Sequence, residues 1–223
     1  MNPHTSARNF LSLARLSGID RVPVTHRPSG SEENDAPPDC LSSIFEHVSS
    51  CTKCTISSDI NNYVFGEGNP SAECMFIGEA PGRDEDIQGH PFVGRAGQLL
   101  TDIITKGMKL SRKDVYIANI LKCRPPENRN PLPGEITNCI GYLHAQIECI
   151  RPKVIIALGT FAAQTLLNTS TPISRLRGSF HSFRDIPLMP TYHPAYLLRN
   201  SSGKASVWED IKKVMDLLGL PVT

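Results

Sequence analysis

Three residues of this chain combine a reactive side chain with a position suited to ligand binding. Glu79 is the only ionisable residue in the turn Gly78-Glu79-Ala80-Pro81-Gly82, whose glycines let a ligand approach the backbone. Asn119 stands among apolar neighbours, so a buried amide there must find a hydrogen-bond partner. His193 follows an apolar run and precedes Pro194. A carboxylate, an amide and an imidazole suit acid–base chemistry on a polar ligand.

Each of these residues also has a purely structural interpretation. Glu79 can be a solvated turn residue, Asn119 can tie down a neighbouring loop, and His193 can be a packing residue. Phe92, between Pro91 and Gly94 in a loop, is either a core side chain or a stacking surface for a ligand ring. Only the location of the four residues in the fold distinguishes these interpretations.

Four cysteines have spacing that suits a metal centre. Cys51 and Cys54 form a CxxC pair, and Cys123 and Cys139 are separated by 15 residues that include a proline-rich loop. Four thiolates are sufficient for zinc or for an iron–sulfur cluster. With only one CxxC, a zinc ribbon with two paired knuckles is a poor match, and the identity of the metal remains open.

The remaining three cysteines have no assigned chemistry. Cys74 begins an apolar run and Cys149 lies near the end of a predicted helix, so both are interpreted as small buried side chains. Cys40 lies in a linker-like segment. The total of seven is odd, which favours reduced thiols or metal binding over a disulfide framework.

Strands and helices alternate along the chain. Continuous apolar runs predict buried strands, helical spacing predicts the segments between them, and residues 179–191 suggest a hairpin. The predicted strands are 74–78, 115–121 and 153–158, and the predicted helices are 41–48, 96–108, 133–149, 161–167 and 207–218. This alternation indicates an α/β sandwich with a mostly parallel sheet.

Parallel sheets bind ligands beyond the carboxyl ends of their strands. The chemistry is therefore expected just after residue 78, around 119–124, after 158 and after 191. Glu79, Asn119 and His193 all fall in these places. The topology alone thus favours the functional interpretation of the three residues.

The composition excludes several classes of protein. The chain has 223 residues and a net charge of +1, so it has no uniformly basic coat for nucleic acid. No apolar run approaches the ~20 residues that a membrane span needs, and no secretory signal is visible. Residues 1–40 are expected to be a flexible tail and linker, with an arginine-containing start that weakly suggests organelle targeting, and residues 41–223 to form the folded domain. Residues 31–50 hold five acids and neither Lys nor Arg, which disfavours DNA contact there.

Taken together, these motifs resemble the family 4 uracil-DNA glycosylases, the iron–sulfur type of bacteria and archaea. The resemblance extends over about residues 45–218 and rests on CTKC, GEAPGRDEDIQGHPFVGRAG, VYIANILKCRPPENRNPLP, KVIIALG and YHPAYLLR, in that order. It implies a three-layer α/β/α sandwich around a four-stranded, mostly parallel sheet. It also implies a cytoplasmic, nucleoid-associated DNA repair enzyme that acts as a monomer.

The resemblance assigns roles to the residues that would bind uracil. Phe92 would stack on a uracil flipped out of DNA, Asn119 would face the uracil edge, and His193 would lie near uracil O2. Glu85 would crowd the C5 methyl group of thymine. Backbone groups of the Gly78–Gly82 turn, including Ala80, would assist at the base. Because an amide turned by 180° would pair with cytosine instead, a hydrogen bond that locks the Asn119 side chain is expected.

The catalytic base is less clearly assigned. Glu79 lies in the water-activating motif, but Ala80 stands where better-known relatives have an aspartate. The base is therefore expected to be Glu79 or Asp86. A relative that traps uracil-DNA covalently through a loop histidine is a poor match, because residues 124–138 contain no histidine.

The resemblance also implies a cluster and a DNA-contact surface. Cys51, Cys54, Cys123 and Cys139 would hold a structural [4Fe-4S] cluster. The segment from Tyr192 to Arg199 resembles a minor-groove loop, in which Leu197 or Leu198 would wedge into the base stack. The side chains expected to contact DNA phosphates are Lys122, Arg124, Arg129 and Arg199.

The implied activity is hydrolysis of the N-glycosidic bond of deoxyuridine, which leaves an abasic site in single- or double-stranded DNA. The target atom C1′ is unreachable within a duplex, so the nucleotide must be flipped out. Two other classes remain: a uracil-DNA-binding module without catalysis, and an iron–sulfur redox or nucleotide-binding protein. The latter would need a phosphate-binding fingerprint, and the Gly78–Gly82 turn is not one.

Overall fold

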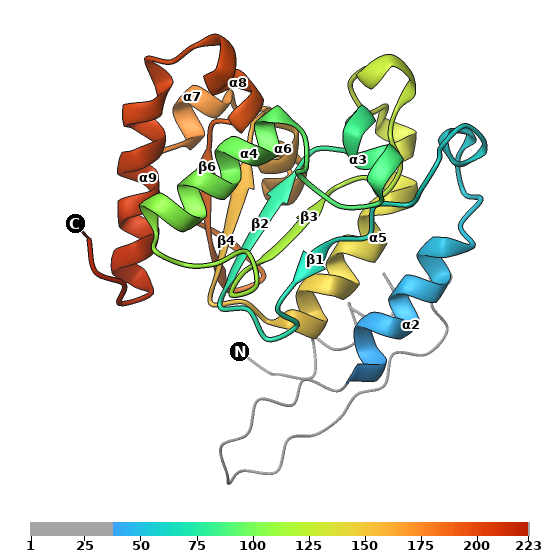
Figure 1. The fold of residues 1–223 in the computed structure, drawn as a ribbon, viewed down its shortest axis with the longest axis horizontal. Helices are drawn as coiled ribbons and strands as arrows, with labels where there is room; N and C mark the ends of the chain where they lie inside the picture. Colours follow the sequence, from blue (N-terminus) through green and yellow to red (C-terminus); the bar gives the residue numbers. More distant parts are fainter. Residues whose placement is uncertain (1–37, 223) are drawn as a thin grey trace, which may run out of the picture.

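The centre of the molecule is a six-stranded sheet in the order β1-β3-β2-β4-β6-β5. The computed structural model describes residues 38–222. The four inner strands are β2 (Cys74–Gly78), β3 (Tyr116–Asn119), β4 (Val154–Leu158) and β6 (Ile186–Thr191). They are mutually parallel, which confirms the predicted parallel core. Figure 1 shows their carboxyl ends at the top of the molecule.

Two short antiparallel strands extend the sheet beyond the predicted four. At one edge β1 (Glu67–Gly68) pairs with β3, and at the other β5 (His181–Phe183) pairs with β6. The second pair is the predicted hairpin. The two residues of β1 have no alternating pattern, so no sequence signal marks them as a strand.

Helices cover both faces of the sheet, as expected for a three-layer sandwich (Figure 1). One core contains side chains of α5 (Pro133–Ile150) and α6 (Thr160–Leu167), and the other contains those of α4 (Arg95–Asp102) and α9 (Gly203–Leu217). Side chains of β2 alternate between the cores: Met75 and Ile77 face the first, Cys74 and Phe76 the second. Both faces of the inner strands are thus buried, which is why these strands appear as unbroken apolar runs.

Short helical segments complete the fold. They are η1 (Thr55–Ser58), α3 (Arg83–Gln88), the π-helical turn η2 (Ile103–Gly107), η3 (Pro126–Asn128), α7 (Ile173–Leu176) and α8 (Pro194–Arg199). The charged segment from residue 83 forms the helix α3. Its end at Gly89 has a left-handed φ of 77°, which glycine adopts at no steric cost.

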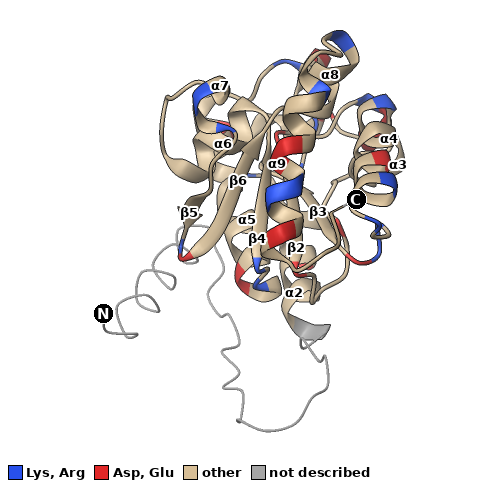
Figure 2. Cartoon of the chain, turned by 90° about the vertical axis from the view of Figure 1, so that its left-hand side faces the viewer, with Lys and Arg blue, Asp and Glu red and all other residues tan. Residues whose placement is uncertain are grey.

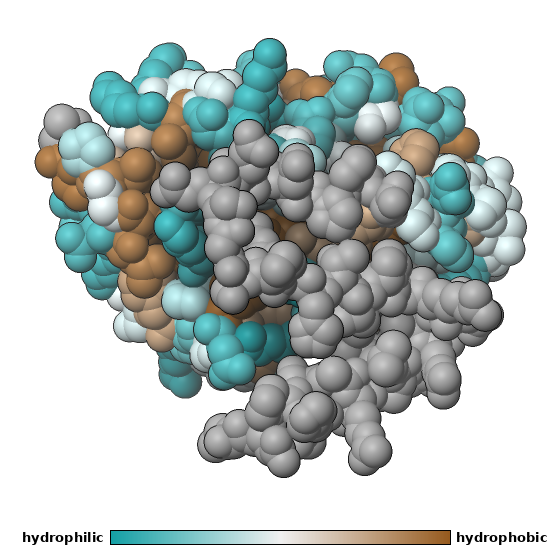
Figure 3. Space-filling model, turned by 90° about the horizontal axis from the view of Figure 1, so that it is seen from below, coloured by the Kyte–Doolittle hydropathy of each residue, from teal (hydrophilic) through white to brown (hydrophobic). Residues whose placement is uncertain are grey.

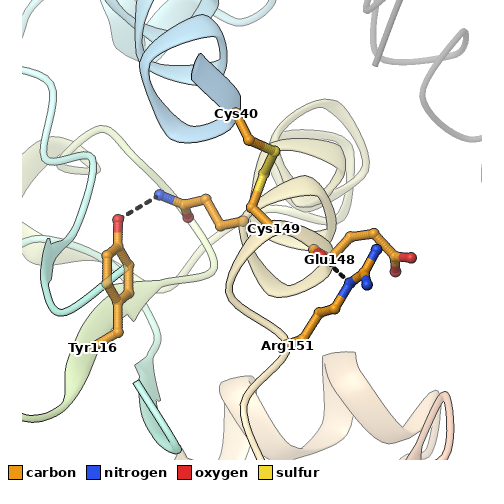
Figure 4. The surroundings of a disulfide bond; sticks show 6 residues. Cys40, Tyr116, Glu148, Cys149 and Arg151 are labelled. Atoms are coloured by element: carbon orange, nitrogen blue, oxygen red, sulfur yellow. Dashed lines mark hydrogen bonds between the residues drawn. A yellow bond between two sulfur atoms is a disulfide. The ribbon is translucent and has the colours of Figure 1, made fainter. Parts of the chain in front are cut away.

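The first described helix, α2 (Pro38–Ser49), packs outside α5 rather than on the sheet. It begins three residues before the expected domain start at 41, and the rest of the predicted tail lies outside the described residues. Cys40 on α2 and Cys149 on α5 form a disulfide, shown in Figure 4. The interpretation of Cys149 as a small buried thiol was therefore wrong, and Cys40, to which no role was assigned from the sequence, is its disulfide partner. Their pairing was not visible in the sequence because 109 positions separate them.

The described part of the chain contains no helix that is both long and apolar enough to cross a membrane. Exposed apolar side chains do occur on the described part of the chain, for example Leu217 at the end of α9 and Val222 after it. Figure 3 shows apolar surface at its left side, among hydrophilic residues. Scattered exposed apolar residues of this kind are normal for globular proteins.

Candidate active site

A cavity of about 780 Å³ lies at the carboxyl ends of the parallel strands. Segments that follow β2, β3, β4 and β6 all contribute to its lining, as the topology predicted. Predicted site residues in this lining are Glu79, Ala80, Glu85, Phe92, Asn119, Arg129, His193 and Arg199. The strand order places β2 between β3 and β4, so the turn after β2 lies at the topological switch point, where such sheets bind ligands.

Asn119 ends β3 and carries an unusual buried acceptor. Its Oδ1 atom is buried and has no hydrogen-bond partner among residues 38–222. A Cβ atom at Gly78 would lie 2.4 Å from this oxygen and 2.6 Å from Cζ of Phe92. Only glycine therefore fits at the end of β2, and packing rather than a hydrogen bond confines the amide. The expected locking hydrogen bond to Oδ1 is absent from residues 38–222, so the packing around Gly78 and Phe92 takes its place in orienting the amide.

Glu79 follows Gly78 and is half-buried in the lining of the cavity. Burial raises the pKa of its carboxyl group to about 7, since the low-dielectric surroundings disfavour the charged form. A carboxyl group with a pKa near neutrality exchanges a proton readily at physiological pH. This is the property of a general acid or base.

His193 is held in one tautomer by its own helix. It caps the N-terminus of α8, and its Nδ1 accepts a hydrogen bond from the amide of Ala195 at 3.1 Å. Burial, with a smaller contribution from the positive charge of Arg199, lowers the pKa of the imidazole to about 4. The ring is therefore neutral at pH 7, with its proton on Nε2. His193 is a hydrogen-bond donor there without being charged.

Two neighbouring features place His193 against the cavity. Gly159, at the end of β4, has a φ of 89°, and a Cβ atom there would lie 2.9 Å from Cβ of His193. Thr191, the last residue of β6, donates its hydroxyl to buried Asp210 of α9 at 2.6 Å, and Arg177 donates to the same carboxylate. This network fixes the strand end that carries His193.

The neighbours Glu85 and Asp86 have different surroundings. Glu85 accepts the amides of Val93 and Gly94 on one oxygen and the amide of Gly82 on the other, all within 3.1 Å. Asp86 is only 1% exposed, is absent from the cavity lining and accepts the backbone and side-chain N–H groups of Asn61. Asp86 therefore holds the segment before β1, and its suggested role as the catalytic base was wrong.

The predicted phosphate contacts are only partly available. Lys122 is 1% exposed, and its ammonium donates to the carbonyl of Asn119 at 3.0 Å and to Gln146 at 2.6 Å. It cannot reach DNA, so that prediction was wrong. Arg124 donates to Asn128, and Arg129 forms a two-bond ion pair with Glu135. Both arginines therefore brace their own loop.

The end of α8 carries side chains that are more exposed than that of Lys122. Leu198 is 43% exposed, whereas Leu197 is 2% exposed in the core below it, so Leu197 is not available as a wedge. Arg199 is exposed beside the cavity. Basic residues also mark α3, α4 and α7 around this end of the molecule (Figure 2), and exposed Arg83, Arg95 and Arg175 lie on these helices. The motifs did not single out these three arginines.

The four cysteines of the predicted metal site line one small cavity between α2, η1 and α5. All four are free thiols. The segment of Cys51 and Cys54 is tied down because Tyr63 donates to the carbonyl of Cys51 and Asn138 to that of Lys53. Within the described residues, no three cysteine, histidine or acidic side chains already stand in the arrangement of a bound metal ion. A shared cavity lined by four thiols nevertheless fits the donor set of an iron–sulfur cluster or zinc.

Sequence reasoning missed Phe161, which lines the cavity just after β4. The topology had marked this position, and an aromatic residue directly after a buried strand is a usable signal. It also missed Arg112, which supports the loop of Phe92 from outside the cavity. No motif around Arg112 indicates this contact.

Comparison with known proteins gives a consistent result. The profile of the uracil DNA glycosylase superfamily matches residues 65–212. A type-4 uracil-DNA glycosylase of Archaeoglobus fulgidus is 45% identical over 187 residues, which are 80% of this chain and 94% of that protein. One from Thermotoga maritima is 43% identical over 78% of this chain and 93% of its own. A type-5 uracil-DNA glycosylase of Pyrobaculum aerophilum is 29% identical over 60% of this chain and 66% of its own.

Identity at this level over most of both chains extends well beyond the site motifs. It agrees with the parallel sheet, the switch-point cavity and the glutamate, asparagine and histidine that line it. The chain therefore belongs to the type-4 uracil-DNA glycosylases within the uracil-DNA glycosylase superfamily.

Proposed function

We propose that this protein is a DNA repair enzyme that hydrolyses the N-glycosidic bond of deoxyuridine, with the switch-point cavity as its active site. The observation that carries the assignment to this cavity is the buried, unpartnered Oδ1 of Asn119 in the cavity lining. An unsatisfied buried acceptor costs about 1–3 kcal/mol. A ligand N–H that reaches it recovers this energy, and uracil N3–H is such a donor.

The remaining contacts fit a uracil ring bound in this orientation. The Asn119 amide nitrogen would donate to O4, and Nε2–H of His193 would donate to O2. Phe92 and His193 line the same cavity, and the centroids of their rings lie 5.6 Å apart. A base whose O2 reaches His193 would therefore lie next to the Phe92 ring, which would stack on it. Stacking of this kind is worth about 1–3 kcal/mol per base and partly offsets the cost of flipping the nucleotide.

The chemistry follows from the charges that develop as C1′–N1 breaks. Negative charge accumulates on uracil O2, where the His193 donor stabilises it, and positive charge accumulates on the sugar. Glu79 in its carboxylate form stabilises the sugar cation and accepts a proton from the attacking water. Asp86 is buried elsewhere, and Ala80 carries no ionisable group, so Glu79 is the base in this proposal.

The exposed end of α8 is proposed to contact the duplex. Leu198 would fill the space left by the flipped nucleotide, and Arg199 would contact a phosphate beside it. Glu85 would exclude the thymine methyl indirectly, because its carboxylate holds the two loops that form the wall of the cavity. We propose that the enzyme acts as a monomer on cytoplasmic DNA, single- or double-stranded, in a prokaryotic cell.

We further propose that Cys51, Cys54, Cys123 and Cys139 hold a [4Fe-4S] cluster. Burial raises the pKa of Cys139 to about 11 and also raises the pKa of Cys54 and Cys123. Thiolates at these three positions therefore need a bound cationic centre to remain ionised. A bound cluster supplies a cross-link here rather than glycosidic chemistry. The cysteines come from the segment after α2, from the start of the proline-rich loop and from α5, so the cross-link would fix the loop that forms one wall of the cavity.

The cluster proposal predicts a specific effect of Cys123→Ala. The variant should lose the absorbance near 400 nm and most of its bound iron, and it should bind uracil-DNA more weakly because the 124–134 loop is released. Cys74→Ala is the matched control, since Cys74 is a buried free thiol outside the cysteine cavity. Absorbance and iron analysis with a DNA-binding titration check this. Full folding and full DNA affinity without iron would exclude the structural role.

The proposed activity is tested by single-turnover excision on an oligonucleotide with one uracil, beside the same strand with thymine. We expect free uracil and an abasic site from the first substrate only. Folded, iron-loaded protein that binds the uracil strand without forming an abasic site would instead support the binding-module alternative.

A further inference from the structure

The loop that carries Phe92 is held from outside the cavity by one arginine. Arg112 lies in the turn between η2 and β3, and its side chain is 23% exposed. One terminal guanidinium nitrogen donates to the carbonyl of Phe92 at 3.3 Å and to the hydroxyl of Thr101 at 3.1 Å. The other donates to the carbonyl of Pro91 at 2.9 Å and to the carboxylate of Glu67 at 2.6 Å. A planar guanidinium suits such divergent acceptors, whereas an ammonium does not.

The backbone of Phe92 needs this support. Its φ of 54° lies in the left-handed region, which costs a residue with a side chain of order 1 kcal/mol or more. Such a conformation persists only where its surroundings impose it. Here Arg112 holds the carbonyls of Pro91 and Phe92, while Glu85 holds the amides of Val93 and Gly94. The Arg112 guanidinium binds two carbonyls and the Glu85 carboxylate binds two amides, so together they hold the backbone of residues 91–94.

Glu67 extends the support to the sheet. It belongs to the edge strand β1, and its second oxygen lies 2.9 Å from Nδ1 of His90. The carboxylate therefore joins Arg112 to the residue just before Pro91. The start of the Phe92 loop is thus tied to the sheet edge, while Glu85 of α3 holds its end.

We propose that Arg112 is a positioning residue for uracil excision: it holds the Phe92 loop in the strained conformation that places the ring for stacking on the flipped base. This inference rests on the proposed function. It adds Arg112, which lies outside the cavity lining, to the residues on which excision depends. Arg112 acts through Phe92, so its removal cannot slow excision by more than the removal of the Phe92 ring itself.

The test is a double-mutant cycle on the single-turnover rate. Arg112→Ala should slow excision about 10- to 100-fold, since small misplacements of a positioning group have effects of this size. In the Phe92→Ala background the same change should cost less than about threefold. Arg112→Lys should recover only part of the rate. Lys113→Ala removes the same charge from the same turn and should leave the rate unchanged.

Two outcomes would overturn the proposal, and both differ from failure of the proposed function. If the wild type is active and Arg112→Ala leaves its rate unchanged, positioning through Phe92 is excluded. It is also excluded if Arg112→Ala lowers the rate by the same factor in the wild-type and Phe92→Ala backgrounds. An inactive wild type instead removes the proposed function. Hydrogen exchange separates loop release from unfolding: Arg112→Ala should speed exchange in residues 89–97 while β2 and β4 stay protected.

Discussion

Glu79→Gln is expected to slow single-turnover excision by about 10²- to 10⁴-fold, the contribution of a positioned general base. The amide has nearly the shape of the carboxyl group, so packing in the half-buried turn should survive. It can neither accept a proton from water nor carry the negative charge that stabilises the developing sugar cation. Rates of uracil release under enzyme excess, measured on one oligonucleotide, check this.

The pH dependence follows from the same residue. Burial raises the pKa of Glu79 to about 7, so the carboxyl group is mainly neutral below that pH and ionised above it. The wild-type rate should therefore rise with pH between about 6 and 8, and Glu79→Gln should flatten this rise. The His193 ring, with a pKa of about 4, stays neutral throughout this window.

Two controls make the Glu79 result interpretable. Glu73→Gln removes an equal charge from an exposed position just before β2, where Glu73 pairs with Lys153, and it should behave as wild type. Asp86→Asn should lower thermal stability, because it weakens the contacts to Asn61, yet keep the pH profile. A Glu79→Gln enzyme within tenfold of wild type would show that another group activates water.

His193→Ala is expected to lower the excision rate by about 10²- to 10³-fold, or roughly 2.7–4 kcal/mol, the usual effect of removing one donor to a developing oxyanion. The reason is that negative charge develops on uracil O2, next to Nε2–H of His193, only as the C1′–N1 bond breaks. Affinity for uracil-DNA should fall far less than the rate. Single-turnover rates and a binding titration on the same substrate separate the two effects.

Two further variants define the His193 effect. His193→Gln keeps a donor without the cap to Ala195 that orients the ring, so an intermediate rate is expected. His47→Ala removes an exposed histidine on α2 and should have no effect. Equal losses in affinity and rate for His193→Ala would mean that the histidine binds the ground state rather than the transition state.

The general location of the candidate active site was predictable from the sequence. The short apolar runs at 74–78 and 154–158, each followed by a Gly-containing turn, indicate strands buried on both faces, and such strands are parallel with helices on either side. Their carboxyl ends then share one edge of the sheet, so Glu79, Asn119 and His193 had to lie near one another. The cavity there confirms this reasoning.

The direction of individual side chains was not predictable. Glu85 and Asp86 are adjacent in α3, as Leu197 and Leu198 are in α8. Neighbours on a helix point about 100° apart, and nothing in their types says which one faces the cavity, the core or the solvent. The sequence indicated that Lys122 belongs to a basic loop. Its side chain is instead buried, and its ammonium group donates hydrogen bonds to the Asn119 carbonyl and to Gln146.

The fold class, the edge of the sheet that carries the candidate site and the residue types available there depend on local periodicity and strand polarity, so all three could be predicted from the sequence. The partners of those residues depend on how whole elements pack. The links from Arg112 to Phe92, from Asp86 to Asn61 and from Cys40 to Cys149 each join distant parts of the chain. Packing of whole elements brings such pairs together, and no short stretch of sequence contains that information.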